Sequence, residues 1–219
     1  MNPLVSFIAL ALFLGGTLIL LASHPRLGFS TVGMKMRRAV PTKLTLLDFI
    51  HSKPSRLERN QLYLFSEETV RSLGYRFIGR FDTAVLHWED APILDLIIEH
   101  KFPIRHLPRQ NRMEDIFQAG LYALALFESG VSCSSTKLVT IYCLQDDAKR
   151  CFERGSVAEC WKCGKSRIHI KRFNPRSIIR TLKKMDEVWY HGRKPKPSPD
   201  PEKCRICPYS MDRCNYSVV

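Results

Sequence analysis

Residues 93–101 have the sequence ILDLIIEHK, an apolar run that ends in a glutamate, a histidine and a lysine. A short run that is mostly apolar is typical of a strand buried on both faces of a sheet. We therefore expect a central strand here. Side chains two positions apart on a strand point to the same face, so Glu99 and Lys101 should lie side by side.

The segments around this strand alternate between strand and helix patterns. Residues 75–88 are rich in aromatic and β-branched residues, which predicts a strand, and residues 89–92 predict the turn that follows it. Residues 113–129 have the apolar spacing of a helix. Further predicted elements are a helical segment over 45–73 broken at Lys53-Pro54, strands over 137–144 and 167–173, and a helix that begins at Pro175. Together these elements predict an α/β fold with a mixed central sheet flanked by helices.

Five polar side chains on these elements form a candidate catalytic group. A hairpin between the first two strands can bring Asp82 beside Glu99 and Lys101. Two carboxylates are hard oxygen ligands for Mg²⁺ or Mn²⁺, and such a metal activates water and stabilises charge on a phosphate. Gln118 and Tyr122 are four residues apart, so they share one helix face and can reach the lysine or a nucleic-acid backbone.

The order of these residues is similar to that in a known family. The chain resembles the PD-(D/E)XK nuclease superfamily, and its RecB-like branch in particular, in three motifs: Gly-x-x-Asp at 79–82, Glu-x-Lys at 99–101 and Gln-x-x-x-Tyr at 118–122. Three late cysteines extend the similarity to the CRISPR-associated RecB-like iron–sulfur exonucleases. The resemblance covers roughly residues 44–214.

The resemblance implies a restriction-endonuclease-like core and a metal-dependent deoxyribonuclease that hydrolyses phosphodiester bonds of DNA, as an exonuclease. It implies three ligands for the Mg²⁺ or Mn²⁺ ion, namely Asp82, Glu99 and the backbone carbonyl of His100. Lys101 would be the catalytic lysine, with the Gln-x-x-x-Tyr pair in support.

Eight cysteines, four of them in two C-x2-C pairs, predict metal ligation rather than disulfides. The resemblance makes Cys204, Cys207 and Cys214 ligands of an iron–sulfur cluster, with zinc as the alternative. The family's early cysteine is absent, because the matching stretch, residues 53–56, is Lys-Pro-Ser-Arg. A possible second metal site lies in and just before an insertion at about residues 145–166 and consists of Cys143, Cys151, Cys160 and Cys163. One of these four could instead supply the missing cluster ligand, or some could be buried thiols.

The 219-residue chain has 34 Lys or Arg against 21 Asp or Glu, a net charge of +13, and its composition excludes a disordered tail or a fibre. Residues 165–196 hold eleven of the basic residues but only Asp186 and Glu187 as acids. Such a segment is typical of a DNA-binding surface, of a surface for anionic lipid or of a solvated helix face.

Residues 4–22 contain no charge and are long enough for a transmembrane helix. Positive residues follow this segment and none precede it, so we expect a single-pass membrane anchor with the nuclease domain in the cytoplasm. A cleaved signal peptide is the alternative. The expected domains are an anchor and juxtamembrane segment at 1–33, the nuclease domain at 34–199 and a cysteine-rich segment at 200–219. The alternative function is a membrane-anchored protein that binds nucleic acid without cutting it.

Overall fold

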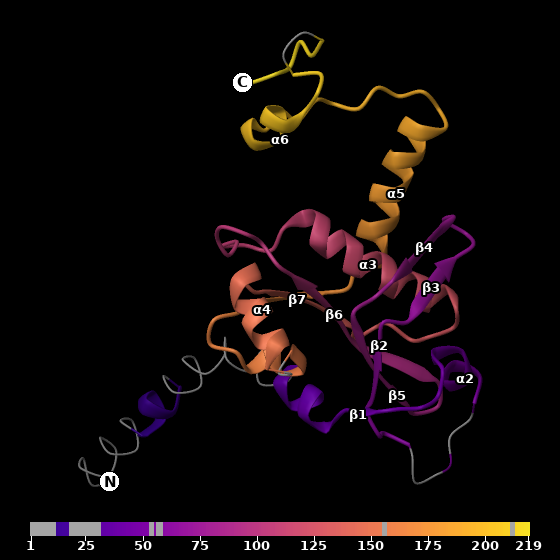
Figure 1. Ribbon diagram of the computed structural model, residues 1–219. Helices are drawn as coiled ribbons and strands as arrows, with labels where there is room; N and C mark the ends of the chain where they lie inside the picture. Colours follow the sequence, from indigo (N-terminus) through magenta and orange to yellow (C-terminus); the bar gives the residue numbers. More distant parts are fainter. Residues whose placement is uncertain (1–11, 18–31, 53–54, 56–58, 155–156, 211–212) are drawn as a thin grey trace, which may run out of the picture. The chain divides into compact units, whose positions relative to one another are not determined.

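The computed structural model describes residues 12–17, 32–52, 55, 59–154, 157–210 and 213–219. Its contacts divide the chain into two units, Met1–Ile178 and Ile179–Val219. The first unit is built on a six-stranded mixed sheet with the order β1-β2-β5-β6-β7-β8 (Figure 1). Its strands are β1 (Val40–Pro41), β2 (Tyr63–Ser66), β5 (Thr83–Trp88), β6 (Pro92–Lys101), β7 (Lys137–Tyr142) and β8 (Arg167–Arg172).

β6 lies inside the sheet, antiparallel to β5 and parallel to β7. Its apolar sequence explains this place, because Leu96, Ile97 and Ile98 are at most 1% exposed and both faces of the strand are therefore covered. The prediction of a buried central strand at residues 93–101 is confirmed. A parallel pair needs a crossover connection, which the helix α3 (Met113–Glu128) provides between β6 and β7.

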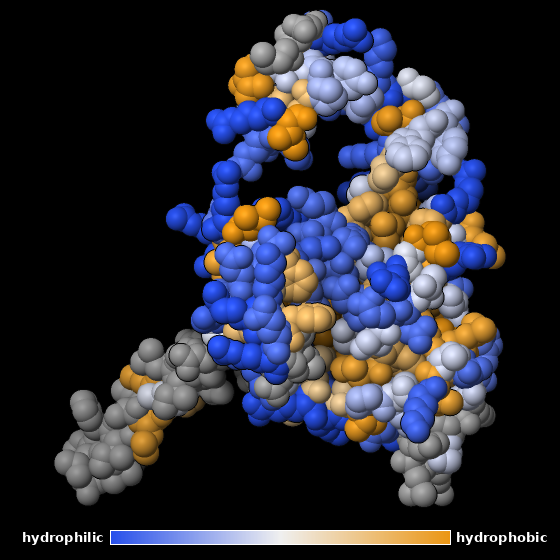
Figure 2. Space-filling model, in the orientation of Figure 1, coloured by the Kyte–Doolittle hydropathy of each residue, from blue (hydrophilic) through white to orange (hydrophobic). Residues whose placement is uncertain are grey.

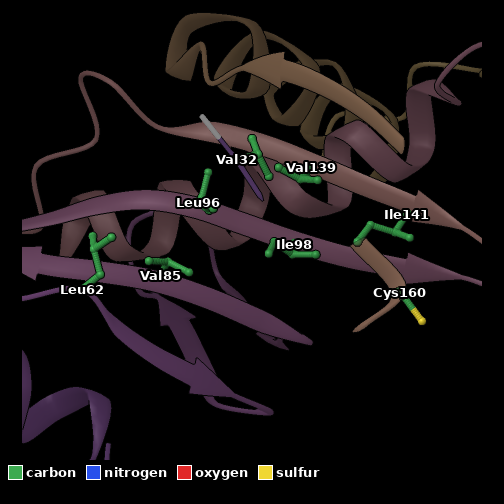
Figure 3. Packing of buried hydrophobic residues seen from close by; sticks show 8 residues of the cluster. All are labelled: Val32, Leu62, Val85, Leu96, Ile98, Val139, Ile141 and Cys160. Atoms are coloured by element: carbon green, nitrogen blue, oxygen red, sulfur yellow. The ribbon is translucent and has the colours of Figure 1, made fainter. Parts of the chain in front are cut away.

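The main apolar core lies on the face of the sheet opposite to α3 (Figure 3). Side chains of β5, β6 and β7 pack there against Val32, from a helix at residues 32–38, and against Cys160, from the short helix η1 (Val157–Lys162). Burial of each large apolar side chain stabilises the fold by about 1.5–3 kcal/mol. Leu138 of β7 lies near α3, whereas the next residue, Val139, belongs to this core. Strand alternation therefore puts α3 and the core on opposite faces.

The remaining elements are β3 (Thr69–Ser72), β4 (Phe77–Arg80), α2 (Leu46–His51), α4 (Gln145–Glu153), α5 (Pro175–Trp189) and α6 (Pro201–Ile206). The predicted helical segment at 45–73 is wrong beyond α2. Residues 63–66 pair with β5, and residues 69–72 pair with β4 in a separate two-stranded sheet. The predicted strand at 75–88 is divided into β4 and β5, so that Asp82 falls between them.

The predicted membrane anchor is corrected by the structure. Nowhere in the described part of the chain is a helix long and apolar enough to cross a membrane. Of the predicted span at 4–22, only residues 12–17 are described; they are helical and mostly apolar (Figure 2). The rest of that span lies outside the described residues. The structure therefore does not support a transmembrane helix in the fold, nor the expected single-pass membrane location.

Candidate active site

A hydrogen-bonded chain of four side chains joins the end of β6 to α3. Lys101 Nζ donates to Glu99 Oε1 at 2.9 Å and to Gln118 Oε1 at 2.6 Å. Gln118 Nε2 donates in turn to the hydroxyl of Tyr122 at 2.8 Å. Strand alternation turns Glu99 and Lys101 toward α3, and the i, i+4 spacing puts Gln118 and Tyr122 on one side of that helix. The structure thus brings together four of the five predicted catalytic side chains.

The glycine of the Gly-x-x-Asp motif makes room for Tyr122. A Cβ atom on Gly79, in β4, would lie 2.6 Å from Cε1 of Tyr122, which is closer than real Cβ atoms approach their neighbours. The ring of Phe81 packs edge-on against the same tyrosine, with ring centroids 6.4 Å apart. β4 therefore limits the positions that the Tyr122 ring, the last of the four hydrogen-bonded side chains, can take. It does so although β4 is not a strand of the main sheet.

Asp82, the fifth predicted residue, lies beside His100 at the end of β6. Its Oδ2 accepts a hydrogen bond from the backbone N–H of His100 at 2.6 Å, and Nδ1 of that histidine is 3.5 Å away. Burial alone would raise the pKa of Asp82, but the side-chain and backbone hydrogen bonds from His100, together with the nearby charges of His100 and Lys101, outweigh burial and hold this pKa below its usual value.

The backbone carbonyl of His100 faces the same side as Asp82. The carbonyl of Lys101 accepts a hydrogen bond from Cys143, just after β7. Because successive strand residues direct their backbone groups to opposite neighbours, the carbonyl of His100 faces away from β7 and toward the Asp82 side. The predicted backbone ligand is therefore placed next to a predicted carboxylate ligand.

Glu99 is almost fully enclosed, with its side chain 4% exposed. One carboxylate oxygen accepts from Lys101, whereas the other, Oε2, has no hydrogen-bond partner. Burial raises the pKa of Glu99 and the negative charge of Asp82 adds to this, against the lowering effect of the Lys101 hydrogen bond. A buried carboxylate oxygen without a partner is costly unless it is protonated or meets a cation.

The expected Mg²⁺ or Mn²⁺ ion fits this donor set. Mg²⁺ is commonly held by one or two carboxylates, with water and substrate phosphate in its other positions. Asp82 and Glu99 would supply the carboxylates, and His100 the backbone oxygen. Among the described residues, no three His, Cys, Asp or Glu side chains form a metal-binding group. A site with two carboxylates and a backbone carbonyl does not require such a group, and the metal stays a prediction.

Asp115 and Tyr142 were not predicted from the sequence, but they lie next to the hydrogen-bonded side chains that end at Lys101. Asp115 Oδ1 is 3.9 Å from Lys101 Nζ, and Asp115 Oδ2 accepts a 2.5 Å hydrogen bond from the Tyr142 hydroxyl. Burial and this hydrogen bond raise the pKa of Tyr142 to about 12. The available signal was helical spacing, because Asp115 lies three residues before Gln118 and on the same helix face.

The two C-x2-C pairs form the same hydrogen-bonded turn. In Cys160–Cys163 and in Cys204–Cys207, the second cysteine's N–H donates to the first cysteine's carbonyl at 3.2 Å. A serine follows each pair after two further residues, Ser166 in one case and Ser210 in the other. Each serine donates both its N–H and, at 2.8 Å, its hydroxyl to the carbonyl of the second cysteine. A turn that keeps two cysteines three positions apart is the local arrangement that C-x2-C metal sites use.

The two pairs belong to different units of the chain. Cys143, at the end of β7, and Cys151, on α4, are in the unit of the first pair, and Cys214 is in the unit of the second. Burial, followed by the neighbouring thiols of the first pair, raises the pKa of Cys143 to about 11. None of the eight cysteines, all of which are described, forms a disulfide. Residues 53–54, where the family's early cysteine would stand, lie outside the described residues.

The predicted basic segment at 165–196 is also divided between the units. Its first part is β8, where Arg167 donates to the backbone carbonyls of Leu107 and Pro108. Its later part includes α5, on which the side chains of Lys183 and Lys184 are exposed. A role of this segment in holding DNA stays a prediction.

Comparisons of the chain with protein-family models, with curated proteins and with solved structures find no match. The resemblance to RecB-like nucleases therefore depends on the motif residues alone.

Proposed function

We propose that the protein is a metal-dependent DNA nuclease that hydrolyses phosphodiester bonds. The observation that supports this most is the unpartnered Oε2 of Glu99, buried in a site that also contains Asp82 and Lys101. A Mg²⁺ or Mn²⁺ ion held by these carboxylates would activate water and stabilise the negative charge that develops on the phosphate.

The chain's own side chains hold the Lys101 ammonium in position. An ammonium has three hydrogens to donate, and Glu99 and Gln118 accept two of them, so the third remains for a water or a phosphate oxygen. Because lysine can only donate, Gln118 must turn its oxygen toward Lys101 and its nitrogen toward Tyr122. A cation that is already in place when charge develops lowers the barrier without further reorganisation.

Cleavage of end-labelled single- and double-stranded DNA by the full chain tests this proposal. We expect cleavage with Mn²⁺ or Mg²⁺ and none with a chelator, and the end label shows whether cutting starts from an end. Lys101→Ala and Glu99→Gln should lower the rate by roughly 10²–10³-fold, as loss of a group that stabilises transition-state charge does. Lys43→Ala, at an exposed position, is the matched control.

A folded protein that binds DNA but does not cut it with either metal would contradict the nuclease proposal. That result would favour a nucleic-acid-binding protein in which the same fold and basic segment act without catalysis.

We also propose that Cys204, Cys207 and Cys214 bind an iron–sulfur cluster, or zinc in its place. The support is the hydrogen-bonded turn that Cys204–Cys207 shares with Cys160–Cys163. We propose a second site, for zinc, at Cys143, Cys151, Cys160 and Cys163; no three of these described side chains form a metal-binding group in the structure, so they would have to move together to bind the ion.

A further inference from the structure

A groove of roughly 500 Å³ opens beside Asp82, between the end of β6 and α4. This is within the range of about 300–1,000 Å³ that small-molecule sites have. We propose that the groove is a nucleobase-binding subsite, which receives an unstacked base of the strand whose phosphodiester lies at Asp82. The inference rests on the proposed nuclease function. The residues that line the groove include Asp82, His100, Phe102, Gln145, Lys149 and Phe152.

Two phenylalanine side chains give the groove its apolar surface. Phe152, on α4, is 75% exposed, and Phe102, just after β6, is 44% exposed. Phe102 is stacked on the imidazole of His100, with ring centroids 6.4 Å apart and planes at 10°. The surface over α4 is otherwise largely hydrophilic (Figure 2). Exposed aromatic rings gathered at one groove are typical of a binding surface, and every nucleobase has a flat face that can stack on them.

The polar lining fits the rest of a nucleotide. Gln145 and Lys149 are four residues apart on α4 and line the same groove. The ammonium of Lys149 can neutralise a phosphate, and the amide of Gln145 can bond to a base edge. Gln145 also donates its backbone N–H to the carbonyl of Pro103 at 3.1 Å, which ties the start of α4 to the segment after β6. Aromatic rings combined with a cation and an amide suit a nucleotide better than an apolar chain.

Asp82 connects the groove to the candidate active site. Its carboxylate accepts the backbone N–H of His100, and both residues line the groove. A phosphodiester at Asp82 would therefore have its neighbouring nucleotide within reach of the two phenylalanine rings. Bases in a duplex are already paired and stacked, so a base can enter only from an unpaired stretch or after it is flipped out. Unpaired DNA should be bound in preference to a duplex.

The test measures binding of an unpaired oligonucleotide that contains the fluorescent base 2-aminopurine. The full chain carries Lys101→Ala so that the strand stays intact, and the series is repeated in the wild-type background with a chelator. Phe152→Ala should weaken binding roughly tenfold, as loss of one stacked base does, and should increase the 2-aminopurine fluorescence that stacking quenches. Phe152→Tyr keeps an aromatic ring and should keep both signals.

Phe127→Ala is the matched control, because Phe127 on α3 is 51% exposed and does not line the groove. Circular dichroism establishes that each variant is folded. Equal affinity and equal fluorescence for Phe152→Ala and Phe127→Ala would overturn the groove proposal, even where the wild type cuts DNA. Stacking that depends on Phe152 in a wild type that cuts no DNA would instead overturn the nuclease proposal and leave the groove standing. A duplex bound and quenched as strongly as the unpaired strand would overturn the need for an unstacked base.

Discussion

Gly79 of β4 and Tyr122 of α3 are in contact so close that position 79 has no room for a side chain, because a Cβ there would lie 2.6 Å from Cε1 of the tyrosine. The contact links a strand outside the main sheet to the hydrogen-bonded chain that ends at Lys101. It also explains why a glycine stands three residues before Asp82 in this chain.

Gly79→Ala should displace the Tyr122 ring and with it the hydrogen bond to Gln118. Forcing an extra methyl into a packed contact costs about 1–3 kcal/mol of unfolding free energy, and we expect slower DNA cleavage as well. Thermal unfolding and cleavage rates measure the two effects. Gly164→Ala is the control, since a Cβ at Gly164 meets nothing within 4 Å. Wild-type stability and rate in Gly79→Ala would show that the tyrosine is free to move.

The raised pKa of Glu99 predicts how metal-free protein responds to pH. The Glu99 carboxyl stays protonated to a higher pH in the folded protein than in the unfolded chain. Between the unfolded-state and folded-state pKa values of Glu99, the folded protein therefore binds more protons than the unfolded chain. The free energy of unfolding should therefore fall as the pH rises from the usual glutamate range through the raised pKa. Glu99→Gln should lack this fall, because it has no titrating proton at that position.

Urea unfolding at a series of pH values, with wild type and Glu99→Gln side by side, measures this effect. The opposite contribution of Asp82, whose pKa is lowered, should persist in the variant, so the difference between the two curves isolates Glu99. Glu114→Gln, at an exposed position on α3, controls for loss of a negative charge. Parallel curves for wild type and Glu99→Gln would contradict the prediction.

Asp95, on β6, should matter for stability. It is 2% exposed, accepts a 2.5 Å hydrogen bond from His87 Nδ1 and forms an ion pair with Lys35, from the helix at residues 32–38. Asp95→Ala would remove the carboxylate that both side chains contact and should cost about 1–3 kcal/mol of unfolding free energy. Chemical denaturation measures the loss, and a loss below 1 kcal/mol, the usual limit for a surface ion pair, would contradict it.

The same cluster predicts a pH dependence through His87. The hydrogen bond to Asp95 raises the pKa of His87 above the usual 6.5. A raised histidine pKa contributes stability that is fully present below 6.5 and is lost as the pH rises through the folded-state value. Asp95→Asn should weaken this loss. Thermal unfolding between pH 5 and 9 checks the effect, and an unchanged pH profile in Asp95→Asn would contradict it.

Anaerobically purified full chain should contain iron and absorb visible light if the C-terminal cysteines hold a cluster. Cys207→Ser should remove both signals. Cys133→Ser should keep them, because Cys133 is buried and its pKa is raised to about 12 by that burial, which disfavours the thiolate that binds metal. Elemental analysis and an absorption spectrum make the comparison. A colourless protein that contains zinc would contradict the cluster and favour the zinc alternative.

The sheet around the candidate site could be predicted because its pattern is simple. Strand β6 is apolar on both faces, and α3 has helical spacing over four turns. The spacing within each element was therefore enough to predict that Glu99 and Lys101 share one strand face and that Gln118 and Tyr122 share one helix face. Helical spacing from Gln118 was a signal for Asp115 itself, but its pairing with Tyr142 was not recognised, because Tyr142 comes from β7, at a distance of 27 positions along the chain. No local pattern shows such a pairing.

The region before Asp82 was mispredicted for the same reason. Residues 63–66 have apolar spacing that suits a helix as well as a strand, and their pairing with residues 83–86 of β5 decides between the two. Local propensity is a weak determinant where sheet hydrogen bonds and burial favour the other state. The anchor prediction depended on the hydropathy of residues 4–22 and on the positive residues that follow them, and it was corrected because the described residues contain no membrane-crossing helix.

Val32 sets a limit on how far the chain can be shortened for experiments. It is 3% exposed among the side chains of the main core, and a Cβ on the next residue, Gly33, would lie 3.3 Å from the ring of Trp161. A truncated protein that starts at Met34 would lose the valine and leave a hole beside Ile98 and Val139, which the surrounding side chains fill only in part. A shorter chain for crystallisation or assay should therefore begin before Val32. Without this valine, a loss of stability would be mistaken for a loss of activity.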